Sequence, residues 1–471
     1  MKTYRYDLVI IGAGSGGYAA ARTARDLGAS VALVDHGPLG GLCILRGCMP
    51  SKTLIASSDS IHEVREAAVL GIHADVRKID LAKIFARKRE IIDGFVEYRT
   101  EGIKAFPLYE GLASFESATR LRVGDDVFLE AKNFIVATGS IIAPPAVIGL
   151  QETGYIDSDD VLDTDTLPGS IVVLGGGYVG CELGQFLSRM GVKTTFVVRA
   201  RQLLSSEDTD VGDAVTLYFR NEGMDVHTNA VVTRVEKRGT KKVVHFMRDG
   251  IDSSVEADEI FHALGRVPNM DGLDLEVAGV ACHAMTGIAV GPDLRTCVPN
   301  IFAVGDVTGV YALVHVAIYQ GEIAARNAVL GTSEQADYRL QKAHTIFTDP
   351  QIAVVGATEK ELRAASVPFF AGSYLFSEHG KAVAINKTKG FVKMLADPET
   401  GRILGAAIVG AEASDLIHEV IVAMYYNGTV QDFAKIPHLH PTLAEILTYP
   451  AEEIALQMDA AREASAVPVG V

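Results

Sequence analysis

Two cysteines, Cys43 and Cys48, are separated by four residues in a segment that ends with Pro50-Ser51-Lys52. This spacing is wider than that of a common zinc knuckle, and it suits a small disulfide ring that opens and closes during turnover. The chain has five cysteines in 471 residues, a sparse and odd number that is typical of a reducing compartment. In that setting we expect a close pair to be catalytic, with electrons supplied by a nearby cofactor.

The elements that precede this pair have the pattern of a dinucleotide-binding unit. A β-rich apolar run leads into a glycine loop, which is followed by a helical pattern and by a second strand that ends at Asp35. Gly12 allows a tight turn, Gly14 lets the backbone approach a pyrophosphate, and Gly17 lets the helix pack close to the sheet. Asp35 is placed to hold a ribose diol, so the sequence predicts a first dinucleotide site here.

The same pattern recurs in the middle of the chain, where Gly175, Gly177 and Gly180 form a second loop between a strand and a helix. The next strand is followed by Arg199 and Arg201 rather than by an acid. An acid at this position binds a free 2′-hydroxyl, whereas an arginine pairs with a 2′-phosphate. The second unit is therefore predicted to bind NADPH. The alternative stays open that both arginines are solvated surface charges and that NADH is used.

Composition excludes several other functions. The length predicts about three domains, and the net charge of −16 gives no basic footprint for nucleic acid or an anionic membrane. No run of eighteen uncharged apolar residues is present, so no membrane span is expected. Residues 1–7 lead into a predicted strand without the features of a signal or transit peptide, which favours a cytoplasmic location.

Taken in chain order, eight segments resemble the class I pyridine nucleotide-disulfide oxidoreductases, the family of dihydrolipoamide dehydrogenase, glutathione reductase and mercuric reductase. Each segment alone is a moderate signal, but their order is highly specific. They are the loop at Gly12, the Cys43–Cys48 segment, Ala137-Thr138-Gly139, the stretch from Gly175 to Glu182, Ala263-Leu264-Gly265-Arg266, residues 299–306, Phe347-Thr348-Asp349-Pro350 and residues 438–445.

The resemblance implies an α/β fold with two Rossmann-like dinucleotide-binding domains, one for FAD and one for NAD(P), plus a C-terminal α+β dimerisation domain. The FAD-binding domain would be split between residues 1–149 and 270–342. The NAD(P)-binding domain would cover residues 150–269, and residues 343–471 would form the interface of a homodimer. The last residues, 460–471, are small and apolar without clear periodicity, so we expect them to fray.

The resemblance gives the two cysteines different roles. Cys48 is implied to lie beside the flavin ring, and Cys43 to attack the substrate. A thiolate is the working nucleophile, so each sulfur needs a lowered pKa, which a helix that begins near Cys48 and a nearby cation would supply. No second cysteine pair has zinc spacing, so no metal site is assigned.

His440 and Glu445 match the acid–base pair of the family, which acts across the dimer on Cys43 of the partner subunit. Glu445 would orient His440 and stabilise its charged form, and His440 would protonate the departing thiol. Without the family, a histidine before a proline near a C-terminus is more often structural. His438, two residues earlier, is interpreted as structural.

The resemblance also places Lys52 near the flavin and pairs it with Glu182, as a buried lysine requires a partner. Tyr178 would cover the nicotinamide pocket until NAD(P)H displaces it. Further cofactor contacts are implied for Ala113, Thr138, Gly139, Gly265 and Asp306, with Asp306 bonded to the ribitol chain. The three other cysteines are interpreted as small core residues: Cys181, Cys282 and Cys297.

The chain departs from the family pattern inside the redox segment, where Leu42 replaces a threonine and Arg46 lies within the ring. Two hypotheses follow for Arg46: it raises thiolate character, or it binds an anionic substrate. Asp35 replaces the commoner glutamate and should still reach ribose hydroxyls. Mercuric reductases carry a C-terminal cysteine pair, but no cysteine follows Cys297 here, which disfavours mercuric-ion reduction.

These features together predict a homodimeric flavoprotein in which NADPH reduces FAD, FAD reduces the Cys43–Cys48 disulfide, and Cys43 exchanges with a small disulfide substrate. One alternative is dihydrolipoamide oxidation with NAD. Another is a reductase of quinones or metal ions, related to mercuric reductase, with the cysteine pair secondary. A scaffold subunit without activity is disfavoured by the intact set of candidate residues. The sequence does not name the disulfide.

Overall fold

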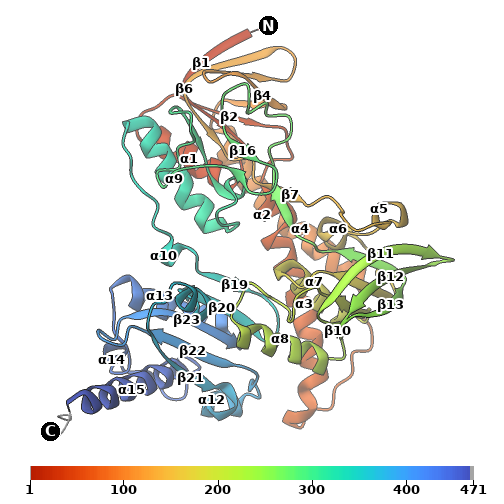
Figure 1. Cartoon of the computed structure of the whole chain (residues 1–471). Coiled ribbons are helices and arrows are strands. Elements are labelled where there is room, and N and C mark those ends of the chain that lie inside the picture. Colours follow the sequence, from red (N-terminus) through yellow and green to blue (C-terminus); the bar gives the residue numbers. More distant parts are fainter. Residues whose placement is uncertain (1, 467–471) are drawn as a thin grey trace.

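The computed structural model describes residues 2–466, which form three main sheets, three smaller ones and covering helices (Figure 1). The first sheet has the order β3-β2-β1-β6-β5-β4, and β18 pairs with β6. The neighbours of β1 are parallel to it, and β4 and β5 add an antiparallel edge. Its strands are β1 (Lys2–Ile11), β2 (Val31–Asp35), β3 (Leu108–Glu110), β4 (Ala113–Ser117), β5 (Arg120–Val123), β6 (Val127–Val136) and β18 (Ile301–Ala303).

Two helices far apart in sequence cover the first sheet together. Helix α1 (Ser15–Asp26) packs against α9 (Val314–Leu330), so the chain returns to this sheet after forming the second one (Figure 1). The last four residues of β1, Leu8–Ile11, are all buried, as expected for a parallel strand covered on both faces. The glycine loop that follows β1 therefore lies at the edge of the sheet where the parallel strands have their carboxyl ends.

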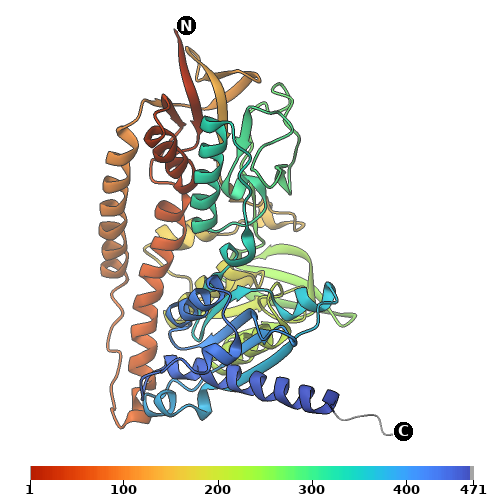
Figure 2. The ribbon, with the colours of Figure 1, turned by 90° about the vertical axis from the view of Figure 1, so that its left-hand side faces the viewer.

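Two long helices lie along one side of the molecule and run side by side for part of their length (Figure 2). They are α3 (Cys48–Glu66) and α4 (Leu81–Lys104), joined through the short helix η1 (Ala67–Leu70). The five-residue helix α2 (Leu42–Arg46) comes just before α3, with Gly47 between them. This arrangement holds Cys43 on one short helix and Cys48 at the first residue of a long one.

The second sheet is fully parallel in the order β10-β9-β8-β14, as a nucleotide-binding unit requires. A three-stranded antiparallel sheet, β11-β12-β13, lies beside it. The strands are β8 (Ser170–Leu174), β9 (Lys193–Val197), β10 (Asp225–His227), β11 (Ala230–Arg238), β12 (Lys241–Arg248), β13 (Ile251–Ala257) and β14 (Glu259–His262). The helices of this part are α6 (Ser158–Asp163), α7 (Tyr178–Arg189) and α8 (Thr209–Asn221).

The third sheet is antiparallel, in the order β19-β20-β23-β22-β21, with helices packed on it. Its strands are β19 (His344–Ile346), β20 (Gln351–Gly356), β21 (Phe370–Leu375), β22 (Phe391–Ala396) and β23 (Ile403–Gly410). The helices are α11 (Glu359–Ala364), α12 (Gly380–Ala384), α13 (Ala413–Tyr425), α14 (Val430–Phe433) and α15 (Thr448–Ala466).

Two short strand pairs lie outside these sheets. Strands β7 (Ser140–Ile142) and β15 (Arg266–Pro268) pair where the chain leaves the first sheet and returns to it. Strands β16 (Cys282–His283) and β17 (Gly287–Ile288) form a small hairpin ahead of the short helix η2 (Gly305–Thr308).

The α/β fold with two Rossmann-like units and a C-terminal α+β part is confirmed. Two details of the sequence analysis are wrong. Cys282 and Cys297 are exposed, because β16 is a short edge strand and Cys297 lies in a turn, whereas Cys181 is buried as expected. Helix α15 continues to Ala466, so part of the stretch 460–471 is helical, and the remainder lies outside the described residues.

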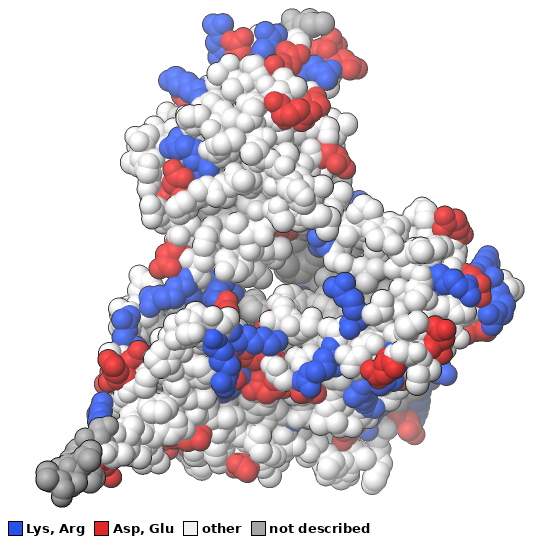
Figure 3. All heavy atoms as spheres, viewed as in Figure 1, with Lys and Arg blue, Asp and Glu red and all other residues white. Residues whose placement is uncertain are grey.

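The face drawn in Figure 3 carries lysines and arginines interspersed with aspartates and glutamates, and no broad field of one sign covers it. Within residues 2–466, no helix combines the length and the apolar character needed to cross a membrane.

Candidate active site

A cavity of about 550 Å³ extends from the first glycine loop to the redox segment. Its size is in the range of small-molecule and cofactor sites, roughly 300–1,000 Å³. Both cysteines line it, together with most of the residues for which sequence analysis predicted FAD contacts. Those residues are Gly12, Gly14, Asp35, Ala113, Thr138, Gly139 and Asp306.

The first glycine loop has the close approaches that its sequence predicts. Gly12 has φ +99°, and a Cβ there would lie 2.4 Å from the carbonyl oxygen of Ala137. A Cβ on Gly17 would lie 1.9 Å from the oxygen of Gly12, so no larger residue fits between helix α1 and the loop. Gly14 is the N-cap of α1 and has no side chain to cap it, which leaves the first amides of the helix free for a phosphate.

Polar groups around the cavity fit a dinucleotide. The Asp35 carboxylate accepts hydrogen bonds from the amides of Ala13 (2.8 Å) and Gly37 (2.7 Å), and each oxygen keeps a lone pair for a ribose hydroxyl. Asp306 accepts a hydrogen bond from the Ser140 hydroxyl at 2.7 Å, which fixes its carboxylate at the cavity wall. The free amides at the start of α1, the carboxylates of Asp35 and Asp306 and the glycine loop together fit the phosphate, ribose and ribitol groups of FAD.

The two thiols differ in acidity. The thiol of Cys43 donates a hydrogen bond to the sulfur of Cys48, and this bond together with the Lys52 charge lowers the pKa of Cys48 to about 6 despite burial. The same hydrogen bond, together with burial, raises the pKa of Cys43. Cys48 is the first residue of α3, where the helix dipole also favours a thiolate. The arrangement therefore stabilises a thiolate on Cys48 and a thiol on Cys43.

Lys52 lies one helical turn after Cys48 and meets Glu182 of α7. The Lys52 Nζ donates to Glu182 Oε2 at 2.7 Å and also lies 4.6 Å from the centre of the Phe347 ring. The other oxygen of Glu182 accepts the Phe347 amide at 2.8 Å. The expected pairing of Lys52 with Glu182 is therefore present, and the carboxylate is fixed from two sides.

The segment from His344 to Asp349 follows α7 for its whole length. His344 contacts Tyr178 at the start of the helix, Phe347 contacts Glu182 one turn later, and Asp349 contacts Gln185 through its amide and carbonyl. The C-terminal part of the chain is therefore attached to the helix that begins at the second glycine loop.

The second glycine loop resembles the first in geometry. Gly175 has φ +111°, and a Cβ there would lie 2.3 Å from the oxygen of Ala263; Gly265 also has positive φ. The N-cap of α7, Gly177, has no side-chain cap and leaves the helix amides free. This helix begins at Tyr178, so the glycine loop leads directly into the first helical residue.

The two arginines after β9 differ in availability. Arg201 donates to Asp213 at 2.7 Å and to Gln202 at 3.1 Å. Arg199 is exposed and has no ion-pair partner among residues 2–466. Of the pair singled out by sequence analysis, Arg199 is therefore the one whose charge is free to meet a ligand.

His440 and Glu445 are in contact in the C-terminal part of the chain. The His440 Nδ1 lies 3.0 Å from Glu445 Oε2, and the imidazole is 76% exposed. Within the described chain His440 has no contact with Cys43 or Cys48. His438, in contrast, is buried and bonded to Glu419 at 2.6 Å, which fits its structural interpretation.

Arg46 turns toward a carboxylate rather than toward the thiols. Its Nη1 lies 3.2 Å from Asp159 Oδ2 on α6. Burial raises the pKa of Asp159, and the Arg46 charge opposes that shift. The cation that acts on both thiols is Lys52.

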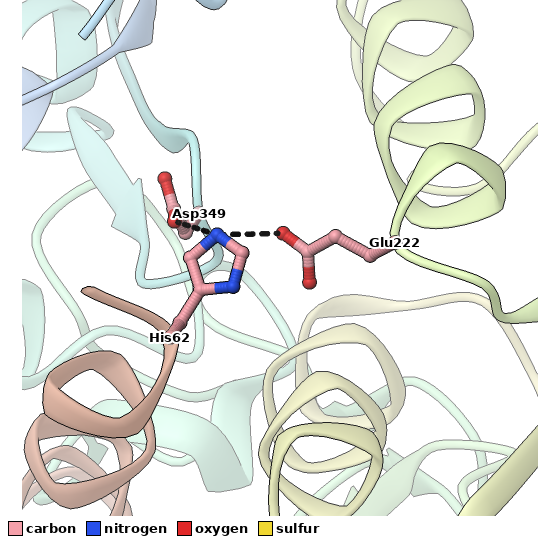
Figure 4. A group of neighbouring side chains, drawn as sticks. All are labelled: His62, Glu222 and Asp349. Carbon is pink, nitrogen blue, oxygen red and sulfur yellow. Dashed lines mark ion pairs between the residues drawn. The ribbon is translucent and has the colours of Figure 1, made fainter. Parts of the chain in front are cut away.

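A three-residue group with the composition of a metal site lies at the far end of α3. His62, Glu222 and Asp349 turn toward one another from three segments (Figure 4). The same carboxylate oxygens that would bind a metal each lie 2.7 Å from the guanidinium of Arg189. Because this cation already occupies the group, we interpret the cluster as structural.

Sequence reasoning missed several residues of this region, notably Glu207, His344 and Arg189. All three act through contacts between segments more than thirty residues apart. None of these three residues belongs to a local sequence motif. The only signal is the position of His344, three residues before the recognised segment that starts at Phe347.

Comparison with known proteins agrees with this geometry. Residues 6–321 match the family model described as pyridine nucleotide-disulphide oxidoreductase. Residues 343–451 match the model of the dimerisation domain of the same family. The second match indicates a homodimer.

Similar proteins of full length are known. The chain is 36% identical to a dihydrolipoyl dehydrogenase of Geobacillus stearothermophilus, over 96% of each protein. It is 32% identical to a mercuric reductase of Bacillus cereus, over 94% of this chain and 70% of that protein. Among solved structures it resembles the HOCl-induced flavoprotein disulfide reductase RclA from Escherichia coli, with a TM-score of 0.84, 27% identity and coverage of 95% and 99%.

The family models, the full-length relatives and the two nucleotide-binding units around a cysteine pair lead to one assignment. Members of this family depend on FAD and use NAD(P) as the second nucleotide. The chain belongs to the pyridine nucleotide-disulphide oxidoreductases and is a flavoprotein oxidoreductase.

Proposed function

We propose that this protein reduces a small disulfide with NADPH, through FAD and the Cys43–Cys48 pair. The observation that carries the proposal is the single cavity that both cysteines line together with the first glycine loop, Asp35 and Asp306. We propose the division into an FAD domain (1–149 and 270–342), an NAD(P) domain (150–269) and an interface domain (343–471). The sparse cysteines support a cytoplasmic location.

Bound FAD would supply the hydride and electron-transfer chemistry that links NADPH to the Cys43–Cys48 disulfide. Residues of the chain set the protonation states of the two sulfur atoms. Lys52 and the N-terminus of α3 stabilise the thiolate of Cys48, and Glu182 holds Lys52 in place. Tyr178 at the second glycine loop covers the nicotinamide position.

The substrate step is thiol–disulfide exchange. Cys43 passes its proton to His440 of the partner subunit, attacks one sulfur of the substrate and forms a mixed disulfide, and the other sulfur leaves with that proton. Cys48 then attacks Cys43, restores the ring disulfide and releases the second thiol, which takes up another proton. The net reaction consumes NADPH, one proton and one disulfide, and yields NADP⁺ and two thiols.

The test of this step compares wild-type enzyme with Cys43→Ser and Cys181→Ser. Cys181 is a buried cysteine outside the pair, so its replacement serves as the control. NADPH-dependent reduction of disulfides, including lipoamide and glutathione disulfide, should fall at least about a thousandfold in Cys43→Ser because the nucleophile is lost. Full disulfide reduction in Cys43→Ser would contradict the proposal.

The preference for NADPH rests on Arg199, which is exposed and unpaired within the described chain, whereas Arg201 is bonded to Asp213. Arg199→Glu should lower kcat/KM for NADPH relative to NADH by about a hundredfold, because a charge-assisted bond to the 2′-phosphate is replaced by repulsion. Arg201→Gln is the matched control and should change the ratio little. A wild-type enzyme that strongly prefers NADH would overturn the NADPH proposal.

Two other reactions remain candidates. Dihydrolipoamide oxidation with NAD is favoured by the name of the relative that is 36% identical over the full length. Reduction of a metal ion is favoured by the Cu(II) complex of RclA, which has a TM-score of 0.84 with this chain. Rates of nucleotide oxidation with lipoamide, low-molecular-weight disulfides, quinones, Hg(II) and Cu(II) separate these reactions, and metal or quinone reduction that survives Cys43→Ser would favour reduction at the flavin.

A further inference from the structure

Tyr178 is held in place by side chains from two separate parts of the chain. Its hydroxyl donates a hydrogen bond to Glu207 Oε1 at 2.6 Å. Its ring stacks on the imidazole of His344, with centroids 5.7 Å apart and planes 24° from parallel. Glu207 follows β9, whereas His344 begins β19, 137 residues further along the chain. The tyrosine is therefore clamped between the second sheet and the third.

The two clamping residues are bonded to each other as well. The His344 Nε2 lies 3.2 Å from the same Glu207 oxygen, and its Nδ1 lies 3.1 Å from the carbonyl oxygen of Lys342. The Lys342 carbonyl and the Glu207 carboxylate both accept hydrogen bonds, so an imidazolium, which donates from both ring nitrogens, satisfies both contacts. Burial lowers the pKa of His344, but the bond to Glu207 outweighs burial and raises it.

We propose that Glu207 and His344 are positioning residues that latch Tyr178 over the nicotinamide pocket. The inference rests on the proposed function, since it takes the nicotinamide ring to enter where Tyr178 now lies. Entry must then break a charge-assisted hydrogen bond and a stack of a cation on an aromatic ring. A pocket that is open only part of the time has an apparent ligand affinity that is reduced in proportion to the fraction of molecules with an open pocket. The latch therefore lowers nucleotide affinity, and its removal raises that affinity.

The latch is also expected to respond to pH. The titratable and charged groups that face His344 are Glu207, Tyr178 and Lys342, and the amine of Lys360 contacts the backbone oxygen of Glu207. As pH rises through the raised pKa of His344, the imidazolium becomes neutral and its ion pair and cation–π contact are lost. Nucleotide affinity should therefore increase with pH in the wild type.

The test measures binding of NADP⁺ and NAD⁺ to the FAD-loaded enzyme by isothermal titration calorimetry, together with kcat and KM for NADPH. Glu207→Gln and His344→Leu should each bind nucleotide about tenfold more tightly. KM should fall by a similar factor and kcat should be retained, because neither residue touches reacting atoms. Damage to the fold would weaken binding, so a gain of affinity separates the latch from a structural role.

The matched control is Asp208→Asn. Asp208 is also buried, also joins the second sheet to the third through Lys393 at 2.9 Å, and has no contact with Tyr178. It should leave nucleotide affinity unchanged. In His344→Leu the increase of nucleotide affinity with pH should be absent. The phosphate of the nucleotide titrates equally with both proteins, so the difference between wild type and His344→Leu reports His344 alone.

Unchanged or weaker nucleotide binding in both Glu207→Gln and His344→Leu would overturn the latch while leaving the proposed function intact. A wild-type enzyme that binds neither nucleotide at any pH would instead overturn the proposed function, and the latch with it. The two failures are therefore distinguished by the wild-type titration alone.

Discussion

Helices α3 and α7 carry two ion-pair clusters that share one spacing and have opposite polarity. At the N-terminal ends, Lys52 of α3 meets Glu182 of α7 at 2.7 Å. Seven residues later on each helix, Asp59 of α3 meets Arg189 of α7 at 2.6 Å. Seven residues are about two turns, or about 10 Å of helix, so two helices packed in parallel bring both pairs face to face.

The clusters differ in how many partners their cation has. Arg189 is 3% exposed and binds Asp59, Glu222 and Asp349, so its donors are used. Lys52 is 31% exposed and binds one carboxylate, beside an aromatic ring and within range of the thiols. A cation with all its donors bonded holds segments together, whereas a cation with one partner still acts on neighbouring groups. The same helix pair thus provides a structural junction at one end and a chemical site at the other.

Removal of Arg189 should have the largest effect on stability. Arg189→Met leaves three carboxylates together without their shared cation and should lower the free energy of unfolding by about 3–5 kcal/mol. Urea denaturation of the FAD-loaded enzyme at neutral pH measures this. Arg65→Gln, which removes only a bond to the Arg189 carbonyl, is the control. A loss below about 1 kcal/mol in Arg189→Met would contradict the structural interpretation.

Removal of Lys52 should change acidity more than stability. Lys52→Met should lower the free energy of unfolding by less than Arg189→Met does, because Lys52 is 31% exposed and leaves one unpaired carboxylate rather than three. It should raise the pKa of Cys48 from about 6 by about one unit. In the reduced wild type the thiolate persists as pH falls until about pH 6, so in Lys52→Met it should disappear at higher pH. The flavin–thiolate absorbance against pH measures this.

Glu182→Gln gives the opposite sign in the same titration. The Glu182 charge raises the pKa of Cys48, so its removal should lower that pKa. Shifts in the same direction for Lys52→Met and Glu182→Gln would refute the electrostatic explanation and would indicate a change of packing instead.

Arg46 should have the smallest effect on this titration. Its charge is directed to Asp159, so Arg46→Ala should leave the pKa of Cys48 within about 0.3 units of the wild-type value. The outcome decides between the two hypotheses that the sequence raised for this residue. A rise of a full unit would restore Arg46 as a second activating cation, and an unchanged value would leave substrate binding as its remaining role.

Much of the site was predictable because its residues lie in short segments of fixed spacing. The two glycine loops, the cysteine pair and the pairing of Lys52 with Glu182 follow from local sequence and the family resemblance. The Arg189 cluster and the His344 latch were not predictable, because each joins segments that only the packed fold brings together.

The fold was predictable at the level of its sheets, since parallel strands separated by helices have a strong pattern. The errors lie where that pattern is weak. Cys282 and Cys297 were taken as core residues from their size and apolar character alone, but a two-residue edge strand and a turn place both at the surface. The end of α15 was taken as irregular because small residues give little amphipathic signal.

The imidazole of His440 is exposed and, among residues 2–466, is bonded only to Glu445, which has a consequence for genetic complementation. If each catalytic centre takes its cysteine from one subunit and its histidine from the other, two inactive proteins can restore each other. A Cys43→Ser subunit paired with a His440→Ala subunit contains one intact centre and one with both defects. Random pairing of equal amounts of the two in a two-fold dimer should therefore recover about a quarter of wild-type activity, although each protein alone is inactive.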